Sequence, residues 1–258
     1  MKIRKILFPL LATTLLLPAG LIAQPKVIAH RGNWDHPGCA QNSIASLRKA
    51  AEAGCYGSEF DVNVTKDGIA VVNHDRTVGK INIEKNPYSA IKDSKLANGE
   101  TLPTLKEYLA EGKKYPQMKL ILEIKSASNQ AAERRATDII MKEVEEMGVQ
   151  DQVEYIAFSL NVVKQVMKND PKAFVAYLNG DLSPIDLKKI EIPGLDYNTN
   201  IMRQNPGWFQ QAKKKGIHIN VWTVDNPDDI RYMINNGVDY ITTNKPELTQ
   251  QLIKEAKE

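Results

Sequence analysis

Short apolar runs rich in β-branched residues alternate with amphipathic runs along most of the chain. The apolar runs predict eight strands, at residues 27–32, 59–64, 120–125, 153–158, 174–178, 195–198, 217–224 and 238–242. The amphipathic runs predict a helix after each strand, at residues 43–51, 104–114, 130–147, 162–168, 184–190, 206–215, 227–235 and 246–257, with Asn42 or Ser43 as the N-cap of the first. This alternation favours a parallel sheet, because the chain must cross back after every strand.

Eight strand–helix units predict a (β/α)8 TIM barrel. The chain has 258 residues, and the part after position 23 suits a barrel of this size. An open doubly wound sheet is the alternative, but it usually carries a glycine-rich phosphate loop after a strand, and the sequence has none. A turn at residues 66–68 and a returning strand at 69–74 predict a small hairpin insertion after strand 2, with loop from 76 to 103. Residues 24–258 are expected to form a single domain.

Residues 1–23 have the pattern of a secretory signal peptide. A basic start is followed by an apolar run from residue 6 to residue 23. A membrane anchor is the alternative, but Pro9 and Pro18 interrupt the run and its length is near the lower limit for a span. We therefore expect an exported, periplasmic protein without stable membrane insertion.

The charge balance argues against a nucleic-acid partner. The chain has 34 basic and 31 acidic residues, and Lys2, Arg4 and Lys5 lie in the predicted signal peptide, so the remainder is balanced at 31 of each. The two cysteines, Cys39 and Cys55, are expected to be free thiols; a disulfide is the alternative in an exported chain. The sequence does not define an oligomeric state.

Polar residues with catalytic chemistry gather on three adjacent predicted strands. Residues at the carboxyl ends of barrel strands share one mouth, and residues two apart on a strand face the same side. The residues concerned are His30, Arg31, Glu59, Asp61, His74, Glu123 and Lys125. His218, by contrast, begins a strand at the opposite end of the barrel and is expected to be structural.

Three of these residues predict a site for a hard divalent cation. Glu59, Asp61 and Glu123 would offer only oxygen ligands, which suit Ca²⁺ or Mg²⁺ better than zinc. Structural salt bridges from these acids to Arg31 and Lys125 are the alternative. Burying so many charged groups within apolar strands is costly without a functional reason.

The remaining residues fit proton transfer and phosphate binding. His30 and His74 can act as an acid/base pair, because imidazole titrates near neutral pH. Arg31 and Lys125 can offset charge that develops on a phosphate in the transition state. Together with a cation, this set predicts metal-assisted phosphodiester hydrolysis.

The motifs that contain these residues resemble those of the glycerophosphodiester phosphodiesterase family. They occur in the family's order over nearly the whole chain after residue 23, at residues 30–32, 41–43, 59–62, 65–68, 72–75, 102–105, 122–125, 221–224 and 237–244. The resemblance implies a (β/α)8 barrel, a divalent metal and hydrolysis of a small glycerophosphodiester to glycerol 3-phosphate and an alcohol. It also implies a role for each site residue: His30 and His74 in acid/base catalysis, Glu59, Asp61 and Glu123 as metal ligands, and Arg31, Lys125 and Trp222 in substrate binding.

The chain departs from the family pattern at three places. Gln41 stands where the family usually has Glu, Phe158-Ser159 reverses the usual Ser-Phe, and Asn244 replaces a usual Asp. Gln41 is expected to lie over the mouth near Arg31 and to tune metal binding. A lipid-cleaving, phosphoinositide phospholipase-like enzyme and a non-catalytic phosphoester-binding barrel are the alternative functions. The first would need an apolar rim, and Gln41 alone supports the second.

Overall fold

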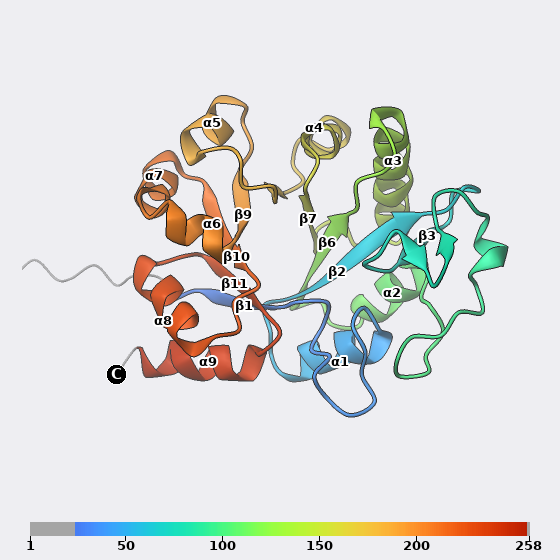
Figure 1. The fold of residues 1–258 in the computed structure, drawn as a ribbon, viewed down its shortest axis with the longest axis horizontal. Coiled ribbons are helices and arrows are strands. Elements are labelled where there is room, and N and C mark those ends of the chain that lie inside the picture. Colours follow the sequence, from blue (N-terminus) through green and yellow to red (C-terminus); the bar gives the residue numbers. More distant parts are fainter. Residues whose placement is uncertain (1–23, 257–258) are drawn as a thin grey trace, which may run out of the picture.

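The computed structural model describes residues 24–256, so the predicted signal peptide at 1–23 lies outside the described residues. Eight parallel strands close into a barrel, because β1 pairs with β2 on one side and with β11 on the other (Figure 1). The barrel strands are β1 (Lys26–Ala29), β2 (Gly57–Val64), β6 (Lys119–Ile124), β7 (Val153–Ala157), β8 (Val175–Tyr177), β9 (Gly194–Asn198), β10 (His218–Trp222) and β11 (Tyr240–Thr243). The predicted (β/α)8 barrel is confirmed.

Helices surround the barrel in the order expected from the sequence (Figure 1). They are α1 (Ile44–Glu52), α2 (Leu105–Gly112), α3 (Gln130–Glu146), α4 (Leu160–Asn169), α5 (Pro184–Lys189), α6 (Thr199–Gln204), α7 (Gly207–Lys215), α8 (Pro227–Asn236) and α9 (Pro246–Glu255). The sequence reading missed α6, a short helix that begins directly after β9, where the Asn198 side chain accepts a hydrogen bond from the Asn200 N–H. Among residues 24–256, no helix combines the length and apolar character needed to cross a bilayer.

The insertion after β2 has more structure than the predicted hairpin and loop. β3 (Ala70–Val72) pairs antiparallel with β2, as expected. The segment predicted as loop also contains a two-stranded ladder of β4 (Thr77–Val78) and β5 (Ile81–Asn82) and a 3-10 turn, η1 (Tyr88–Ala90). This part of the prediction was incomplete, because such short strands show no readable alternation. Four buried side chains give the insertion its own small core: Val71, Ile83, Ile91 and Leu102.

Strand alternation separates the helix-facing core from the barrel interior. On β2, Phe60 and Val62 are fully buried among the helices, and the Phe60 ring packs 4.3 Å from that of Tyr108 on α2. Glu59 and Asp61 therefore point to the opposite side, into the barrel. Core packing on one face of β2 thus fixes the position of the carboxylates on the other.

The barrel interior is itself divided. Its apolar part is formed by Ile28, Ile121, Ile156, Ala176 and Leu178. β9, β10 and β11 instead contribute three buried polar side chains: Asp196, Asn220 and Thr242.

Cys39 and Cys55 are both free thiols, as predicted. Burial raises the pKa of each, that of Cys55 to about 12. Both therefore stay uncharged near neutral pH, where the thiol is a poorer nucleophile than the thiolate.

Candidate active site

The turn after β1 and the adjacent β2 bring the first site residues together. β1 ends at Ala29, and Arg31 adopts a left-handed conformation with a φ of 55°. This turn directs the Arg31 backbone N–H to Glu59 Oε2, at 2.8 Å. A non-glycine residue in this conformation costs about 1–3 kcal/mol, and such strain gathers at functional sites.

The three predicted metal ligands form one buried carboxylate cluster. Asp61 and Glu123 are direct partners in the parallel register of β2 and β6, and Glu59 lies two residues before Asp61. One oxygen from each residue lies within 4.8 Å of the others. The three residues are 3%, 1% and 7% exposed, so water screens little of their mutual repulsion.

That repulsion, together with burial, perturbs the acids strongly. Burial first, and then the charges of Asp61 and Glu123, raise the pKa of Glu59 well above its usual value. Burial and the Asp61 charge raise the pKa of Glu123 to about 7. A divalent cation among these oxygens would offset the repulsion between the carboxylates and stabilise their charged forms, so the donor set fits such an ion.

Asp61 differs from its two neighbours. Burial acts to raise its pKa, but Lys125 and a hydrogen bond from Asn42 outweigh that effect, and its pKa lies below the usual value. The Lys125 Nζ lies 3.2 Å from Asp61 Oδ1 and 2.8 Å from Glu123 Oε1. Ion pairing, the structural alternative in the sequence reading, is thus present beside the carboxylate cluster.

Asn42 is a site residue that the sequence reading did not assign. Its side chain donates to Asp61 Oδ2 at 2.9 Å and accepts from the Asp61 backbone N–H at 3.1 Å. Ser43, the other expected N-cap, is the residue that caps α1. The available signal was the Gln41-Asn42-Ser43 motif, within which Asn42 was interpreted only as a helix cap.

His30 is held by a chain of hydrogen bonds that ends in an acid. Its Nδ1–H donates to Asn244 Oδ1 at 2.9 Å, and Trp34 Nε1 donates to the same oxygen at 3.0 Å. Asn244 Nδ2 in turn donates to Asp225 Oδ2 at 2.7 Å. This leaves His30 Nε2 available for proton transfer. Burial and the Arg31 charge lower the pKa of His30, which favours its neutral form near pH 7.

His74 comes from the loop after β3, and two amides brace that loop. Its Nδ1 lies 2.8 Å from Asp75 Oδ1. Asn63 Nδ2 donates to the carbonyls of Asn73 and Asp75, at 2.7 and 3.2 Å, and Asn73 Nδ2 donates to the Asp75 carbonyl at 2.7 Å. His74 thus has an ordered position although it is more exposed than His30.

Arg31 reaches the rim of the mouth. Its Nη1 donates to Gln41 Oε1 at 2.7 Å, and its Nε lies 3.5 Å from Asp61 Oδ2. Gln41 therefore lies beside Arg31, as expected from the sequence.

The wall opposite the carboxylates is mostly apolar. One cavity is lined on one side by His30, Arg31, Glu59, His74 and Glu123, and on the other by Ile156, Phe158, Leu178, Asp196, Trp222 and Thr242. The Phe158 and Trp222 rings meet edge to face at 5.7 Å, and Trp222 Nε1 donates to the Asp196 carbonyl at 2.8 Å. Phe158 was noted in the sequence only as a departure from the family pattern, yet it forms part of the cavity.

The structure thus brings all eight predicted site residues to one end of the barrel. Six line the cavity, and Asp61 and Lys125 contact them directly. His218 lies at the start of β10, against the ring of Phe174, in keeping with a structural role. A carboxylate cluster, two imidazoles and two cations around one cavity can bind a phosphoester and exchange protons with it.

Comparisons with known proteins agree with this chemistry. The sequence model of the Glycerophosphoryl diester phosphodiesterase family matches residues 30–248. A curated Glycerophosphodiester phosphodiesterase from Caldanaerobacter subterraneus subsp. tengcongensis is 30% identical over 244 residues, which is 88% of this chain and 97% of that protein.

Solved structures share the fold. A glycerophosphodiester phosphodiesterase from Parabacteroides distasonis is 42% identical, with a TM-score of 0.90 over 91% of this chain and 99% of that one. A phosphodiesterase from Oleispira antarctica, solved with the product sn-glycerol-3-phosphate, is 24% identical, with a TM-score of 0.76 over 90% and 97% of the two chains, and shows the fold alone. From the family match, the identity to these relatives and the barrel itself, the chain belongs to the glycerophosphoryl diester phosphodiesterase family.

Proposed function

We propose that this protein hydrolyses glycerophosphodiesters to glycerol 3-phosphate and an alcohol, with a bound Ca²⁺ or Mg²⁺ and with His30 and His74 as the acid/base pair. The observation that carries the proposal is one cavity that holds two oriented imidazoles beside a buried carboxylate cluster. Family membership supplies the reaction class.

Glu59, Asp61 and Glu123 would hold the cation through carboxylate oxygens. When bound, the ion would offset the negative charge of the phosphate oxygens and of the three acids. Asn42 keeps Asp61 in place through two hydrogen bonds, so the position of this ligand is fixed before any ion binds.

The two histidines would move the protons of the reaction. One takes a proton from the attacking hydroxyl group, which belongs to water or to a neighbouring substrate group, and the other gives a proton to the oxygen of the departing alcohol. In each histidine Nδ1 is bound by a side-chain oxygen, so Nε2 is the nitrogen that faces this task.

The two walls of the cavity suit two different parts of the substrate, its phosphate and its glycerol. Arg31 and Lys125 would bind the phosphate next to the carboxylate cluster. Trp222, with Phe158 and Leu178, would contact the carbon atoms of glycerol. The phosphate would then face the histidines and the glycerol would lie across from them.

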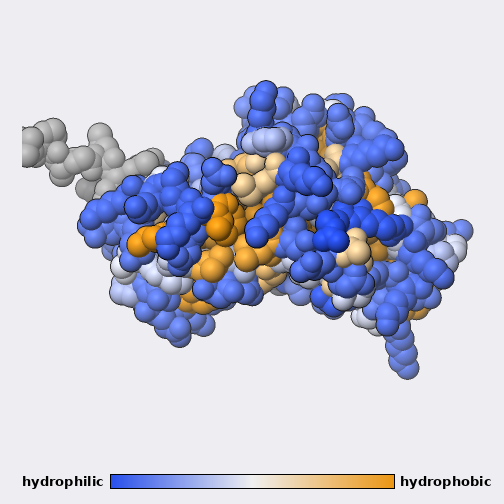
Figure 2. Space-filling model, turned by 90° about the horizontal axis from the view of Figure 1, so that it is seen from above, coloured by the Kyte–Doolittle hydropathy of each residue, from blue (hydrophilic) through white to orange (hydrophobic). Residues whose placement is uncertain are grey.

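The two alternative functions fit less well. Among residues 24–256, the exposed large hydrophobic side chains are Ile185 and Ile190, on and just after α5. In the face seen in Figure 2, hydrophilic residues cover most of the outer part, and hydrophobic residues gather near the middle. A membrane-touching rim, which a lipid-cleaving enzyme needs, has little support here. Both oriented histidines argue against a barrel that only binds phosphoesters.

The test is an assay of purified protein with a panel of glycerophosphodiesters, in Ca²⁺, in Mg²⁺ and in excess chelator. We expect release of glycerol 3-phosphate with either or both ions and its loss in chelator. Equal turnover in chelator would exclude the metal, and the absence of turnover on the whole panel would favour a binding protein.

We also propose that residues 1–23 direct export to the periplasm, on the basis of their sequence pattern. Fractionation of cells that produce the full chain, with mass spectrometry of the product, tests this. A periplasmic product that begins near residue 24 is expected, whereas a full-length membrane-bound product would favour the anchor.

A further inference from the structure

A second cleft adjoins the active site and carries an excess of positive charge. It lies between the insertion after β2 and the segment that joins β6 to α3. Its charged lining residues are Lys66, Arg76, Lys85, Lys125, Arg135 and Glu84. Five cations thus face a single acid, and one of the five, Lys125, also reaches the carboxylate cluster.

The other four cations are available to meet a ligand. Lys66, Arg76, Lys85 and Arg135 are all exposed, and none forms an ion pair with an acid in the part of the chain that the structure describes. Arg135 Nη2 donates one hydrogen bond to the Lys66 carbonyl, at 3.2 Å, which holds these two residues together. Because the acceptor is a neutral carbonyl, this bond does not neutralise the Arg135 charge.

The acid of the cleft is already engaged. Glu84 accepts hydrogen bonds from the backbone N–H of Ser128, at 3.0 Å, and from its hydroxyl. Because cations outnumber the single acid, the cleft has a positive potential and attracts anions.

The cleft and the active site share structural elements. Lys125 stands between them. Asn63 lines the cleft, lies two residues after Asp61 on β2, and braces the loop that carries His74. Arg76 follows His74 by two residues. A substrate whose phosphate lies at Lys125 and His74 therefore has the cleft directly beside it.

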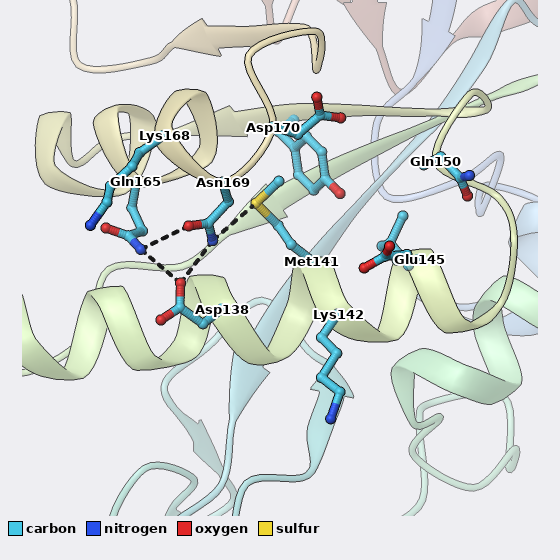
Figure 3. Close-up of a pocket in the computed structure, with 11 residues that line it drawn as sticks. Asp138, Met141, Lys142, Glu145, Gln150, Gln165, Lys168, Asn169 and Asp170 are labelled. Carbon is cyan, nitrogen blue, oxygen red and sulfur yellow. Dashed lines mark hydrogen bonds between the residues drawn. The ribbon is translucent and has the colours of Figure 1, made fainter.

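A groove between α3 and α4 provides a contrast (Figure 3). It contains acids and lysines in similar number, and its amides bond within the groove: Gln165 Nε2 donates to Asp138 and Asn169, and Asn169 Nδ2 donates to Asp138, each within 3.0 Å (Figure 3). Asp138, Gln165 and Asn169 thus bond to one another, and the acids and lysines of the groove give it no excess of positive charge. The cleft beside Lys125 has such an excess.

We propose that this cleft binds a second anionic group on the alcohol half of the substrate, so that the enzyme prefers glycerophosphodiesters whose alcohol carries a phosphomonoester or another anion. The inference rests on the proposed function. Arginine and lysine side chains supply the donors that a phosphate requires, and their exposure lets the group bind without a large desolvation cost.

The experiment compares two substrates that differ by one phosphate: glycerophosphoglycerol and the same diester with a phosphomonoester on its second glycerol. The measured quantity is the ratio of kcat/KM for the phosphorylated substrate to that for the plain one. We expect a ratio above one at low salt that falls as salt rises, because exposed charges are screened. Arg76→Gln and Lys85→Gln should each lower the ratio about two- to fivefold, the usual effect of one exposed charge pair.

Lys214→Gln/Lys215→Gln is the matched control, because it removes two cations at the end of α7, outside the cleft. It should leave the ratio unchanged. A ratio at or below one, or a ratio that Arg76→Gln/Lys85→Gln does not lower, would overturn the inference while the phosphodiesterase activity stands. No turnover of either substrate would instead contradict the proposed function.

Discussion

The two walls of the catalytic cavity are built on opposite principles. The charged wall, formed by β1, β2 and β6, carries His30, the carboxylates and the cations, each fixed by hydrogen bonds or ion pairs. The apolar wall, formed by β7, β8 and β10 and the residues that follow them, presents Ile156, Phe158, Leu178 and Trp222. The first is arranged for charge that changes during a reaction, and the second for contacts that stay the same.

Two buried aspartates in the barrel interior show what this difference does. Asp61, on the charged wall, has a lowered pKa because Lys125 and Asn42 offset its burial. Asp196, on β9, is equally buried, but its Oδ1 has no hydrogen-bond partner among the described residues, and burial raises its pKa to about 8. The same residue type is thus an anion on one side of the barrel and a neutral acid on the other.

The largest effect on activity is expected from substitution of the two mouth histidines, His30 and His74. His30→Ala and His74→Ala should each lower kcat by roughly 10²–10⁴-fold, the usual contribution of a positioned proton-transfer group. Circular dichroism should show an unchanged fold, since both residues lie at the mouth. His218→Ala, at the opposite end of the barrel, is the control and should keep kcat. Wild-type kcat in either mouth variant would refute the assignment.

Asp196, the neutral acid opposite the charged wall, should make the free energy of unfolding depend on pH. The folded-state pKa of Asp196 is raised above its unfolded value, so the folded state holds a proton that the unfolded state releases between about pH 4 and 8. The wild type should therefore lose roughly 4 kcal/mol of unfolding free energy between pH 5 and pH 8, at about 1.4 kcal/mol per pH unit, relative to Asp196→Asn.

Denaturant unfolding of both proteins in chelator measures this difference. Because all other titrating groups are shared, subtracting the two curves gives the contribution of Asp196 together with its electrostatic coupling to Glu123. Parallel curves between pH 5 and pH 8 would mean that Asp196 is ionised in the folded protein, and the contrast with Asp61 would then fail.

The sequence predicted the charged wall better than the apolar one. Glu59 and Asp61 could be assigned because strand alternation puts residues two apart on one side, and the sequence of β2 alternates in that way. Phe158 and Leu178 follow short strands that are buried on both faces, so alternation does not show which residues face the cavity. Tertiary packing alone decides that.

Hydrogen-bond partners were also beyond the sequence. Asn244 is separated from His30 by most of the chain, and only closure of β11 onto β1 brings them together. Likewise the strands β4 and β5 form because the insertion folds over Val71 and Ile83, which no local pattern reveals. Long-range contacts of this kind have no local signature.

A third prediction concerns the carboxylate cluster of the charged wall. Glu59→Gln keeps the size of the side chain but removes one charge from the proposed cation site. Metal affinity, measured by calorimetry and by the metal dependence of activity, should fall by at least the roughly 10- to 100-fold that loss of a hydrogen-bond partner of a ligand costs. Glu52→Gln, on the outside of α1, is the control. Full activity of Glu59→Gln in excess chelator would remove the metal from the mechanism.

Gln41→Glu, at the rim of the mouth, should change metal affinity less than Glu59→Gln does, and in the opposite direction. Its Oε1 already accepts from Arg31 Nη1, so Gln41→Glu places a negative charge beside Arg31 without changing the geometry. The added charge should tighten metal binding by up to about 1–2 kcal/mol, because the position is partly screened. A metal titration of activity in both proteins measures it. An unchanged dependence would place Gln41 outside the site, and activity that appears only in the Glu variant would favour a non-catalytic wild type.

The smallest effect on activity is expected from substitutions in the apolar wall. What matters here is whether KM or kcat changes, more than the size of the change. Phe158 contacts Trp222 edge to face, an arrangement that contributes about 0.5–1.5 kcal/mol. Phe158→Ala should therefore raise KM about two- to tenfold and leave kcat nearly unchanged. In the proposed binding mode, glycerol carbons would touch this wall equally before and during the reaction, so the loss should be the same in the ground state and the transition state. Phe158→Leu, which keeps an apolar surface, should recover most of the affinity. A fall in kcat with an unchanged KM would show that this wall also acts on the transition state, and the division of labour between the two walls would be wrong.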